Sequence, residues 1–182
     1  MSKVYTFLSE GLEEVECLAV VDILRRAGVE VTLVSITNYL EVTGSHQITI
    51  KADILFKDAN FFDADLLFLP GGMPGTKNLG NHKELGELLI AFNKSAKRIA
   101  AICAAPSVLG SLHLLDGRTA TCYPGFEDKL IGARYTTTGV ITDKNITTAR
   151  GLGFAIDLGL ELVSLLEGEI KSKEIKSAIQ YE

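Results

Sequence analysis

The sequence predicts a doubly wound α/β fold: a mainly parallel sheet sandwiched by helices. Continuous apolar segments such as 66–69 alternate with amphipathic segments of ten or more residues, and right-handed crossovers between parallel strands place such helices on both faces of a sheet. The chain has 182 residues, of which 47% are hydrophobic, enough to bury a substantial core. Because no repeat, low-complexity segment or linker interrupts it, we expect a single domain over 1–182.

In the first half of the chain, strand patterns are continuous apolar runs, helix patterns repeat apolar residues three and four apart, and a hairpin alternates polar with apolar residues. In order, these are a strand over 3–8, a helix over about 12–27 capped by Gly28, a strand over 30–36, an inserted hairpin over 40–50 interrupted at Gly44-Ser45, a strand over 66–69, a glycine-rich turn over 70–75 and a helix over about 82–94.

The second half continues the alternation and ends in two helical patterns. In order, we expect a strand over 98–102, a helix that ends near 115–117, short strands over 119–122 and 135–138, a hairpin of 140–142 with 146–149, a helix over 154–166 and a charged tail helix over about 172–179. In a sheet of this kind, ligands bind at the carboxyl ends of the strands. The loops after residues 8, 69 and 102 therefore converge on one edge.

Composition argues against several classes of partner. The net charge is −5 and the lysines are scattered, so nucleic-acid binding lacks its electrostatic attraction. Cys17, Cys103 and Cys122 form no C-x-x-C pair, which argues against a disulfide framework or a structural zinc site and favours a reducing cytoplasm. We find no signal peptide, membrane span or nucleotide-binding glycine motif, and expect no cofactor, no metal and no membrane association.

Cys103 is the first candidate for chemistry. An apolar strand runs directly into this cysteine and then into a helical pattern, and Ala101, Ala104 and Ala105 are small enough for a sharp strand-to-helix bend. Such a bend directs the sulfur at a helix N-terminus, where unpaired N–H groups and the dipole lower a cysteine's pKa. The alternative is a small buried hydrophobe, since free cysteine is among the most buried residue types.

Two other loops reach the same edge of the sheet. After the strand over 66–69, Gly71 and Gly72 can bring main-chain N–H groups close to a ligand, although such a segment is also typical of a plain tight turn. The first helix opens with Glu13, Glu14 and Glu16, which are either solvated charges or site residues. Periodicity leaves open whether Glu14 or Glu16 faces the site.

The three histidines argue against a familiar kind of cysteine site. His46 lies in the expected hairpin, His82 starts a helix and His113 falls near the end of the helix after Cys103. None directly follows the thiol or has an acidic partner in a late loop, so a Cys-His-Asp/Glu triad is hard to assemble. A carboxylate is the expected acid–base partner of Cys103.

Four motifs together carry a resemblance: Gly11-Leu12-Glu13-Glu14-Val15-Glu16, Leu69-Pro70-Gly71-Gly72, Ala101-Ile102-Cys103-Ala104-Ala105-Pro106 and Ala149-Arg150-Gly151. With them the chain resembles the ThiJ/PfpI superfamily over nearly its whole length, and more narrowly the branch of the parkinsonism-associated protein and its bacterial relatives. The resemblance implies a flavodoxin-like sandwich of the class I glutamine amidotransferase kind, a homodimer, and a reactive Cys103 hydrogen-bonded to a protonated Glu16.

The resemblance assigns further residues. It implies that the backbone N–H groups of Gly72 and Ala104 form an oxyanion site beside Gly71, and that Arg150 and Gly151 support the pocket or the dimer. Ala104 stands where the protease-like branch has histidine, so we expect no peptidase activity.

A second departure lies after the helix that follows the cysteine. Tyr123 precedes Pro124, where mammalian-type members have a histidine. A phenol can donate or accept a hydrogen bond but is a poor base at neutral pH, so we expect Tyr123 to orient substrate.

The activity that the resemblance implies is a cysteine-dependent, cofactor-independent glyoxalase or deglycase. It would convert glyoxal to glycolate and methylglyoxal to lactate, or remove their early glycation adducts, and so protect against carbonyl and oxidative stress. The alternative is a non-enzymatic, redox-responsive chaperone or stress sensor that acts through oxidation of Cys103. A role in thiamine biosynthesis has no phosphate or nucleotide motif to support it.

Overall fold

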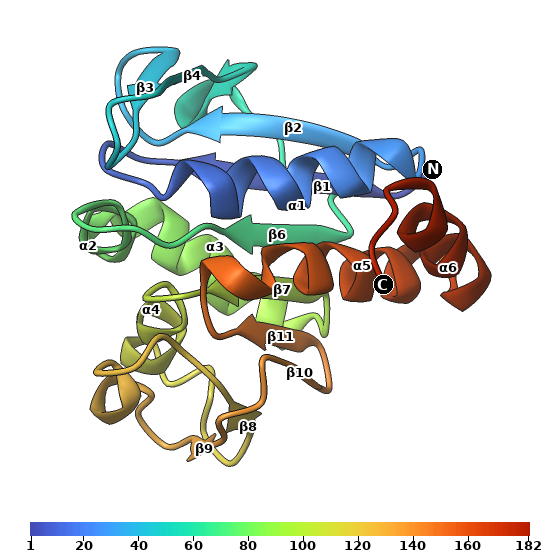
Figure 1. Cartoon of the computed structure of the whole chain (residues 1–182). Helices are drawn as coiled ribbons and strands as arrows, with labels where there is room; N and C mark the ends of the chain where they lie inside the picture. Colours follow the sequence, from blue (N-terminus) through green and yellow to red (C-terminus); the bar gives the residue numbers. More distant parts are fainter.

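The central feature of the computed structural model, which describes residues 1–182, is a seven-stranded sheet in the order β10-β11-β7-β6-β1-β2-β5 (Figure 1). Its strands are β1 (Lys3–Leu8), β2 (Glu30–Ser35), β5 (Ile54–Leu55), β6 (Leu66–Leu69), β7 (Arg98–Ile102), β10 (Val140–Asp143) and β11 (Ile146–Ala149). Only β10 is antiparallel to its neighbour. The order of β2, β1, β6, β7 and β11 is that of the flavodoxin-like doubly wound sheet, which confirms the predicted fold class.

Helices cover both faces of this sheet. The element bounds are α1 (Glu14–Arg26), α2 (Gly75–Asn81), α3 (Lys83–Lys94), α4 (Pro106–Ser111), α5 (Ala155–Glu167) and α6 (Glu169–Ala178). Helices α1 and α5 pack over one face, with α6 against α5, while α2, α3 and α4 cover the other. Both faces need this cover because both are apolar. In β6, for example, Leu66 and Phe68 belong to one core cluster, and Leu67 and Leu69 belong to the other.

Three local expectations need correction. The helix after Cys103 does not reach residues 115–117: α4 ends at Ser111, and His113 then has a left-handed φ of 57°. Helix α2 was not predicted, because Gly75 and Gly80 weaken the helical pattern. The short strands expected over 119–122 and 135–138 are shorter, and β8 (Thr119–Ala120) and β9 (Arg134–Tyr135) pair in parallel outside the main sheet.

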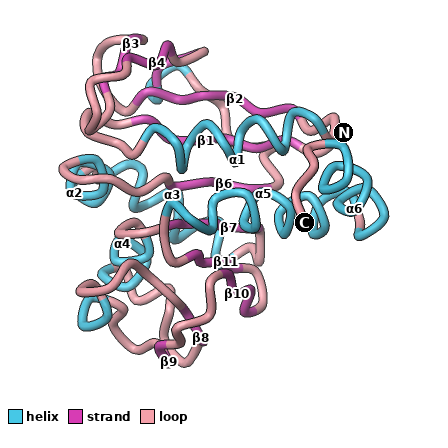
Figure 2. Tube along the Cα trace, viewed as in Figure 1, coloured by secondary structure: helices cyan, strands magenta, loops and turns pink.

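The inserted hairpin is confirmed as β3 (Glu41–Thr43) and β4 (Thr49–Lys51), an antiparallel pair separate from the main sheet. In Figure 1 the hairpin and α2 lie at the end of the sheet toward which the arrows of β2 and β6 point. The tube in Figure 2 shows loops gathered at this end, whereas both chain termini lie at the opposite end near α6. The carboxyl ends of β1, β6 and β7 thus meet where this fold places ligand sites. No helix of the structure combines the length and the apolar character that a membrane crossing requires.

Candidate active site

Cys103 occupies a strained bend between β7 and α4. Its φ of 64° lies in the left-handed region, which non-glycine residues adopt rarely and mostly where the surroundings impose it. The backbone is held on both sides: the N–H of Cys103 donates to the carbonyl of Ala149 at 2.9 Å, and its carbonyl accepts from the N–H of Tyr123 at 2.8 Å. The side chain remains partly exposed. The bend predicted from the small flanking residues is therefore present.

Glu16 lies beside this thiol in the first turn of α1. It is 1% exposed, and its Oε2 accepts from the N–H of Gly71 at 3.1 Å. A Cβ added at Gly71 would overlap this oxygen and lie 2.6 Å from the Cβ of Cys103, so the carboxyl group and the cysteine side chain are neighbours. Burial raises the pKa of Glu16 to about 7, although hydrogen bonds from Cys103 and from the backbone of Gly71 and Leu152 lower it. The structure thus brings together the two residues that the resemblance paired.

The thiol itself behaves differently from the sequence-based expectation of a lowered pKa, which was wrong. Burial, followed by the charge and the hydrogen bond of the Glu16 carboxylate, raises the pKa of Cys103 to about 12, whereas the N–H groups of Gly72 and Ala104 lower it. Because the two groups interact, they titrate as a pair. With one proton in the pair, the forms SH/COO⁻ and S⁻/COOH carry the same net charge, so moving the proton to Glu16 exposes a thiolate without a second deprotonation.

The turn after β6 is shaped to fit this pair. A Cβ added at Gly71 would overlap the Glu16 carboxylate and come within 2.6 Å of the Cβ of Cys103. Gly72 has a φ of 90°, which glycine adopts without strain. The carbonyl of Gly71 accepts from the N–H of Glu13 at 2.9 Å, so the turn is also fixed to the start of α1.

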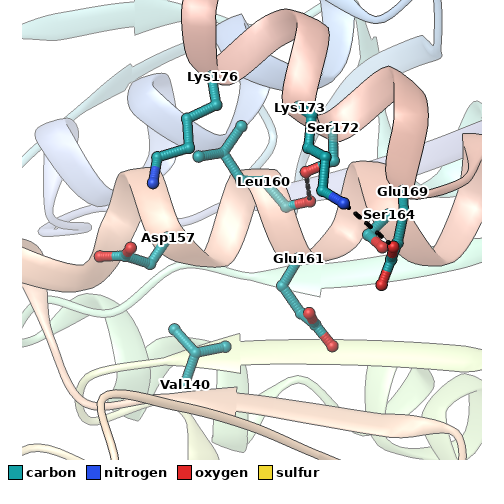
Figure 3. Close-up of a pocket in the computed structure, with 9 residues that line it drawn as sticks. All are labelled: Val140, Asp157, Leu160, Glu161, Ser164, Glu169, Ser172, Lys173 and Lys176. Atoms are coloured by element: carbon teal, nitrogen blue, oxygen red, sulfur yellow. Dashed lines mark hydrogen bonds and ion pairs between the residues drawn. The ribbon is translucent and has the colours of Figure 1, made fainter. Parts of the chain in front are cut away.

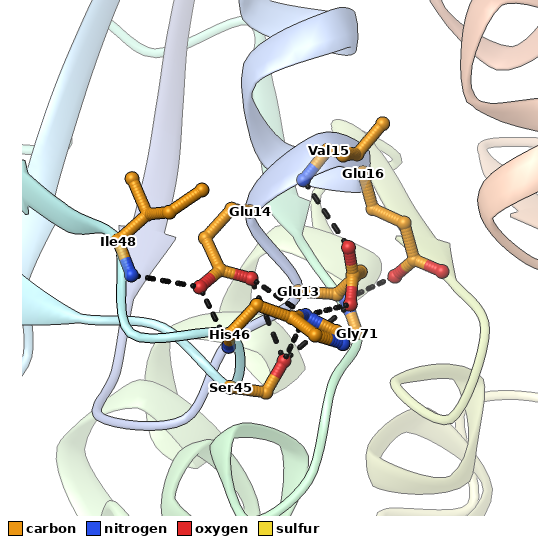
Figure 4. A network of polar contacts seen from close by, with 8 residues as sticks. All are labelled: Glu13, Glu14, Val15, Glu16, Ser45, His46, Ile48 and Gly71. Carbon is orange, nitrogen blue, oxygen red and sulfur yellow. Dashed lines mark hydrogen bonds and ion pairs between the residues drawn. The ribbon is translucent and has the colours of Figure 1, made fainter.

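Glu14 points to the β3–β4 hairpin, on the side opposite to Glu16, and anchors the hairpin (Figure 4). Its Oε1 accepts from the N–H groups of His46 at 2.8 Å and Ile48 at 3.3 Å, and the residue is 2% exposed. These backbone bonds help to lower the pKa of Glu14, although burial raises it. Periodicity had left Glu14 and Glu16 as equal candidates, and only Glu16 reaches Cys103.

Glu13 completes a polar group at the helix start. Glu13, Glu14 and His46 place one ligand atom each within 4.8 Å of one another, a geometry that could hold a metal ion and that sequence spacing did not reveal. However, Glu13 already accepts from the N–H of Val15 at 3.3 Å and caps the helix. Since Glu14 likewise accepts hydrogen bonds from the hairpin, we assign the group to anchoring the hairpin.

The remaining predicted residues surround the thiol less directly. Tyr123 is 50% exposed, and its ring lies 3.2 Å from the position that a Cβ on Gly151 would take. Pro124 is exposed beside it, and Ala104 is buried. The charge of Arg150 acts on the thiol of Cys122, where it lowers a pKa that burial raises to about 11.

Cys103 is the only thiol that reagents can reach in the folded chain. Cys17 and Cys122 are both free and 0% exposed, and burial raises the pKa of Cys17 to about 12. No histidine has a polar contact with Cys103, since His46 contacts Glu13 and Glu14, His82 contacts Glu84, and His113 contacts Asp116.

Sequence inspection missed the main-chain groups that complete the site. The N–H of Leu152, which lowers the pKa of Glu16, and the carbonyl of Ala149, which accepts from the N–H of Cys103, belong to backbone that any residue could supply. A groove of about 440 Å³ between α5 and α6 (Figure 3) contains none of the site residues. Its lining ion pair, Lys173–Glu169 at 3.4 Å, joins consecutive turns of α6 and is exposed.

Comparison with known proteins gives a consistent result. The family model described as the DJ-1/PfpI family matches residues 2–165. Over 179 residues the chain is 36% identical to Protein DJ-1 homolog B of Arabidopsis thaliana, covering 97% of this chain and 41% of that relative. This chain therefore spans less than half the length of that plant protein.

Other relatives match along nearly their full length. The glutathione-independent glyoxalase DJR-1.2 of Caenorhabditis elegans is 32% identical over 168 residues, covering 91% of this chain and 89% of that one. Among solved structures, oxidized DJ-1 of Toxoplasma gondii superposes with a TM-score of 0.95 at 32% identity, covering 100% of this chain and 99% of that one.

Proposed function

The chain belongs to the DJ-1/PfpI family, and on that premise we propose that it is a glutathione-independent glyoxalase that converts small 2-oxoaldehydes to 2-hydroxy acids. One observation carries the proposal: the buried Glu16 carboxyl group lies beside the side chain of Cys103 across Gly71, and each group shifts the pKa of the other. A nucleophile in contact with a group that can both give and take a proton near neutral pH is what this reaction requires. The name of the Caenorhabditis elegans relative supports the same activity.

The proposed reaction begins at the sulfur. The Cys103 thiolate attacks one aldehyde carbon of glyoxal, and the resulting oxyanion takes the proton from Glu16 to give a hemithioacetal. The N–H groups of Gly72 and Ala104, which face the sulfur, are placed to stabilise the oxyanion. Glu16 is left as a carboxylate beside the new carbon–sulfur bond.

The second half of the reaction moves a proton between adjacent carbons. The Glu16 carboxylate removes the C–H proton of the hemithioacetal to form an enediol and returns a proton to the neighbouring carbon, which gives a thioester of glycolate. Water then hydrolyses the thioester, releasing glycolate and the thiol. Glyoxal and one water thus become glycolic acid, with one carbon oxidised and the other reduced, so no external redox partner or cofactor is needed.

The surroundings complete the proposal. The exposed ring of Tyr123 orients the substrate, and early glycation adducts are a second substrate class for the same pair.

Val15 and Leu18 expose 49% and 40% of their surface on α1, which supports the homodimer as part of this proposal. The three free cysteines support a place in the reducing cytoplasm.

The direct test is steady-state turnover. The purified chain is incubated with glyoxal or methylglyoxal without glutathione, and glycolate or lactate is quantified against enzyme concentration. We expect many equivalents of hydroxy acid per chain. A product yield that stops at one equivalent would contradict the enzyme and favour the redox-responsive alternative, in which Cys103 is consumed.

The redox alternative has its own supporting observation. Cys103 is the one partly exposed thiol, and N–H groups beside the sulfur suit an oxidised, anionic cysteine as well as an oxyanion. Peroxide and a carbonyl substrate would both react with the thiolate that forms when Glu16 holds the proton. The number of product equivalents per chain therefore distinguishes the two functions.

Replacing Gly71 by alanine tests the pairing itself. We expect turnover to fall about a hundredfold, because the new Cβ would overlap the Glu16 carboxylate and approach the Cβ of Cys103 to 2.6 Å. Gly80→Ala is the matched control, since its Cβ would meet only Val108 at an ordinary 3.6 Å. The kcat of both variants with methylglyoxal checks this; equal kcat values would show that the turn does not set the pair's geometry.

A further inference from the structure

Glu13 lies between the β3–β4 hairpin and the catalytic pair. On the hairpin side, its Oε2 is 3.2 Å from Nδ1 of His46 and accepts from the hydroxyl of Ser45 at 3.4 Å. Within α1, its Oε1 accepts from the N–H of Val15 at 3.3 Å. Glu13 is only 9% exposed, whereas the His46 side chain is 69% exposed, so solvent screens the Glu13 charge less toward Glu16 than toward His46.

On the catalytic side, Glu13 and Glu16 hold the same turn from opposite directions. The backbone N–H of Glu13 donates to the carbonyl of Gly71 at 2.9 Å, and the N–H of Gly71 donates to Oε2 of Glu16 at 3.1 Å. In Figure 4, dashed lines join Gly71 to Glu16, and His46 to Glu13 and Glu14. The backbone of Glu13 thus keeps the two glutamates on either side of one peptide unit, and a change of the Glu13 side chain acts on Glu16 through its charge.

We propose that Glu13 is a positioning residue for the reaction at Cys103: its buried carboxylate, held between the hairpin and the turn at Gly71, acts on Glu16 through its negative charge, and His46 is its counter-charge. This inference rests on the proposed function, because it states what makes Glu16 an acid at neutral pH. The proposal also gives the β3–β4 hairpin a second role, because the charge of His46 sets how strongly the charge of Glu13 acts on Glu16.

The charges around Glu16 support this assignment. Glu13 is the only other carboxylate whose charge contributes to the raised pKa of Glu16, after burial, while Cys103 and the N–H groups of Gly71 and Leu152 oppose the rise. On its other side, Glu13 faces His46, whose own pKa is raised by hydrogen bonding to Glu14 and then by the charge of Glu13.

The remaining titratable neighbours do not reverse the effect of the Glu13 charge on the pKa of Glu16. Cys17, which follows Glu16, stays protonated because burial raises its pKa to about 12. Glu14 turns its carboxylate to the hairpin backbone and contacts Nδ1 of His46 at 3.1 Å.

The test compares three variants by the pH dependence of Cys103 alkylation with iodoacetamide, which requires no turnover. Glu13→Gln removes the negative charge, so Glu16 should lose its proton more easily and the midpoint near neutrality should move to lower pH by on the order of half a pH unit. His46→Gln removes the counter-charge and should move the midpoint to higher pH.

Glu14→Gln is the matched control, because Glu14 is similarly buried and bonded to the hairpin but makes no such contribution to Glu16. Since hydrogen bonding to Glu14 raises the pKa of His46, any shift in this variant should be to higher pH, opposite to that of Glu13→Gln. A merely structural role in anchoring the hairpin would make Glu14→Gln shift the midpoint as much as Glu13→Gln. That result, or shifts of Glu13→Gln and His46→Gln in the same direction, would overturn the proposal.

Turnover measured in parallel separates this inference from the proposed function. If the chain is a glyoxalase, the pH profile of kcat should follow the alkylation midpoints, with KM nearly unchanged. If wild type forms no more than one equivalent of product, the glyoxalase proposal fails while the alkylation midpoints still decide the role of Glu13. Unchanged midpoints alongside normal turnover would overturn the role of Glu13 alone.

Discussion

Replacing Cys103 by alanine is expected to lower kcat for glyoxal and methylglyoxal by at least about a thousandfold, to the level of the uncatalysed reaction. Every step of the proposed reaction passes through a bond to this sulfur. Neither remaining thiol can substitute for it, because both are 0% exposed: Cys17 lies on α1 and Cys122 in the loop after β8. The variant should fold normally, because the Cys103 side chain is partly exposed and its removal leaves little empty space in the core.

The controls use the other two cysteines. Cys17→Ala and Cys122→Ala should keep near-normal kcat while losing about 1 kcal/mol of stability each, because each removes a buried sulfur from a packed core. Initial rates of hydroxy-acid formation and urea unfolding check both statements. If Cys103→Ala retained more than a tenth of wild-type turnover, the covalent route would be wrong and a Glu16-based route without thiol attack would replace it.

The fold was largely predictable from sequence because its strands are unambiguous. Leu66-Leu67-Phe68-Leu69 is a continuous apolar run that only a strand covered on both faces explains, and the structure buries all four residues. Helix α2 was hidden because Gly75 and Gly80 weaken the helical pattern, and Gly75 is required by close packing: a Cβ there would meet the Cα of Leu12 at 2.7 Å. Contacts of this kind join segments that are distant in sequence and leave no periodic signal.

The site was predictable to the level of residue types but not of orientation. Cys103 at a bend followed from its small neighbours, and the structure gives it the φ of 64° that such a bend needs. Glu14 and Glu16 could not be separated by periodicity, because each partner comes from elsewhere: the hairpin backbone for Glu14, and Cys103 with Gly71 for Glu16.

The error in the thiol's pKa has the same origin. The N–H groups that lower it were visible in the local pattern, whereas burial and the Glu16 carboxylate, which raise it to about 12, depend on the tertiary structure.

Glu16→Gln is expected to make the protein less active and more stable at once. Glutamine has the shape and neutrality of the protonated carboxyl group but cannot move a proton, so kcat should fall by about a hundredfold to ten-thousandfold. In wild type, the pKa of Glu16 is about 7 in the folded chain against 4.5 for the free group. Between these values the unfolded chain releases a proton that the folded chain retains, so stability falls as the pH rises from 4.5 to 7.

The expected difference in stability between Glu16→Gln and wild type therefore depends on pH. Below pH 4.5 both forms are neutral and should be equally stable, whereas above pH 7 wild type carries the full cost of a buried charge, about 3 kcal/mol. Glutamine does not titrate, so the variant should unfold at a temperature up to about 10 °C higher than wild type at pH 8. Thermal unfolding at pH 4 and pH 8 measures both ends, and Glu14→Gln, which removes a carboxylate that its hydrogen bonds favour, should instead destabilise the chain at pH 8. A Glu16→Gln variant that lost stability at pH 8 would show that Glu16 is held as a structural carboxylate, and the protonated acid required at Cys103 would then have to come from another group.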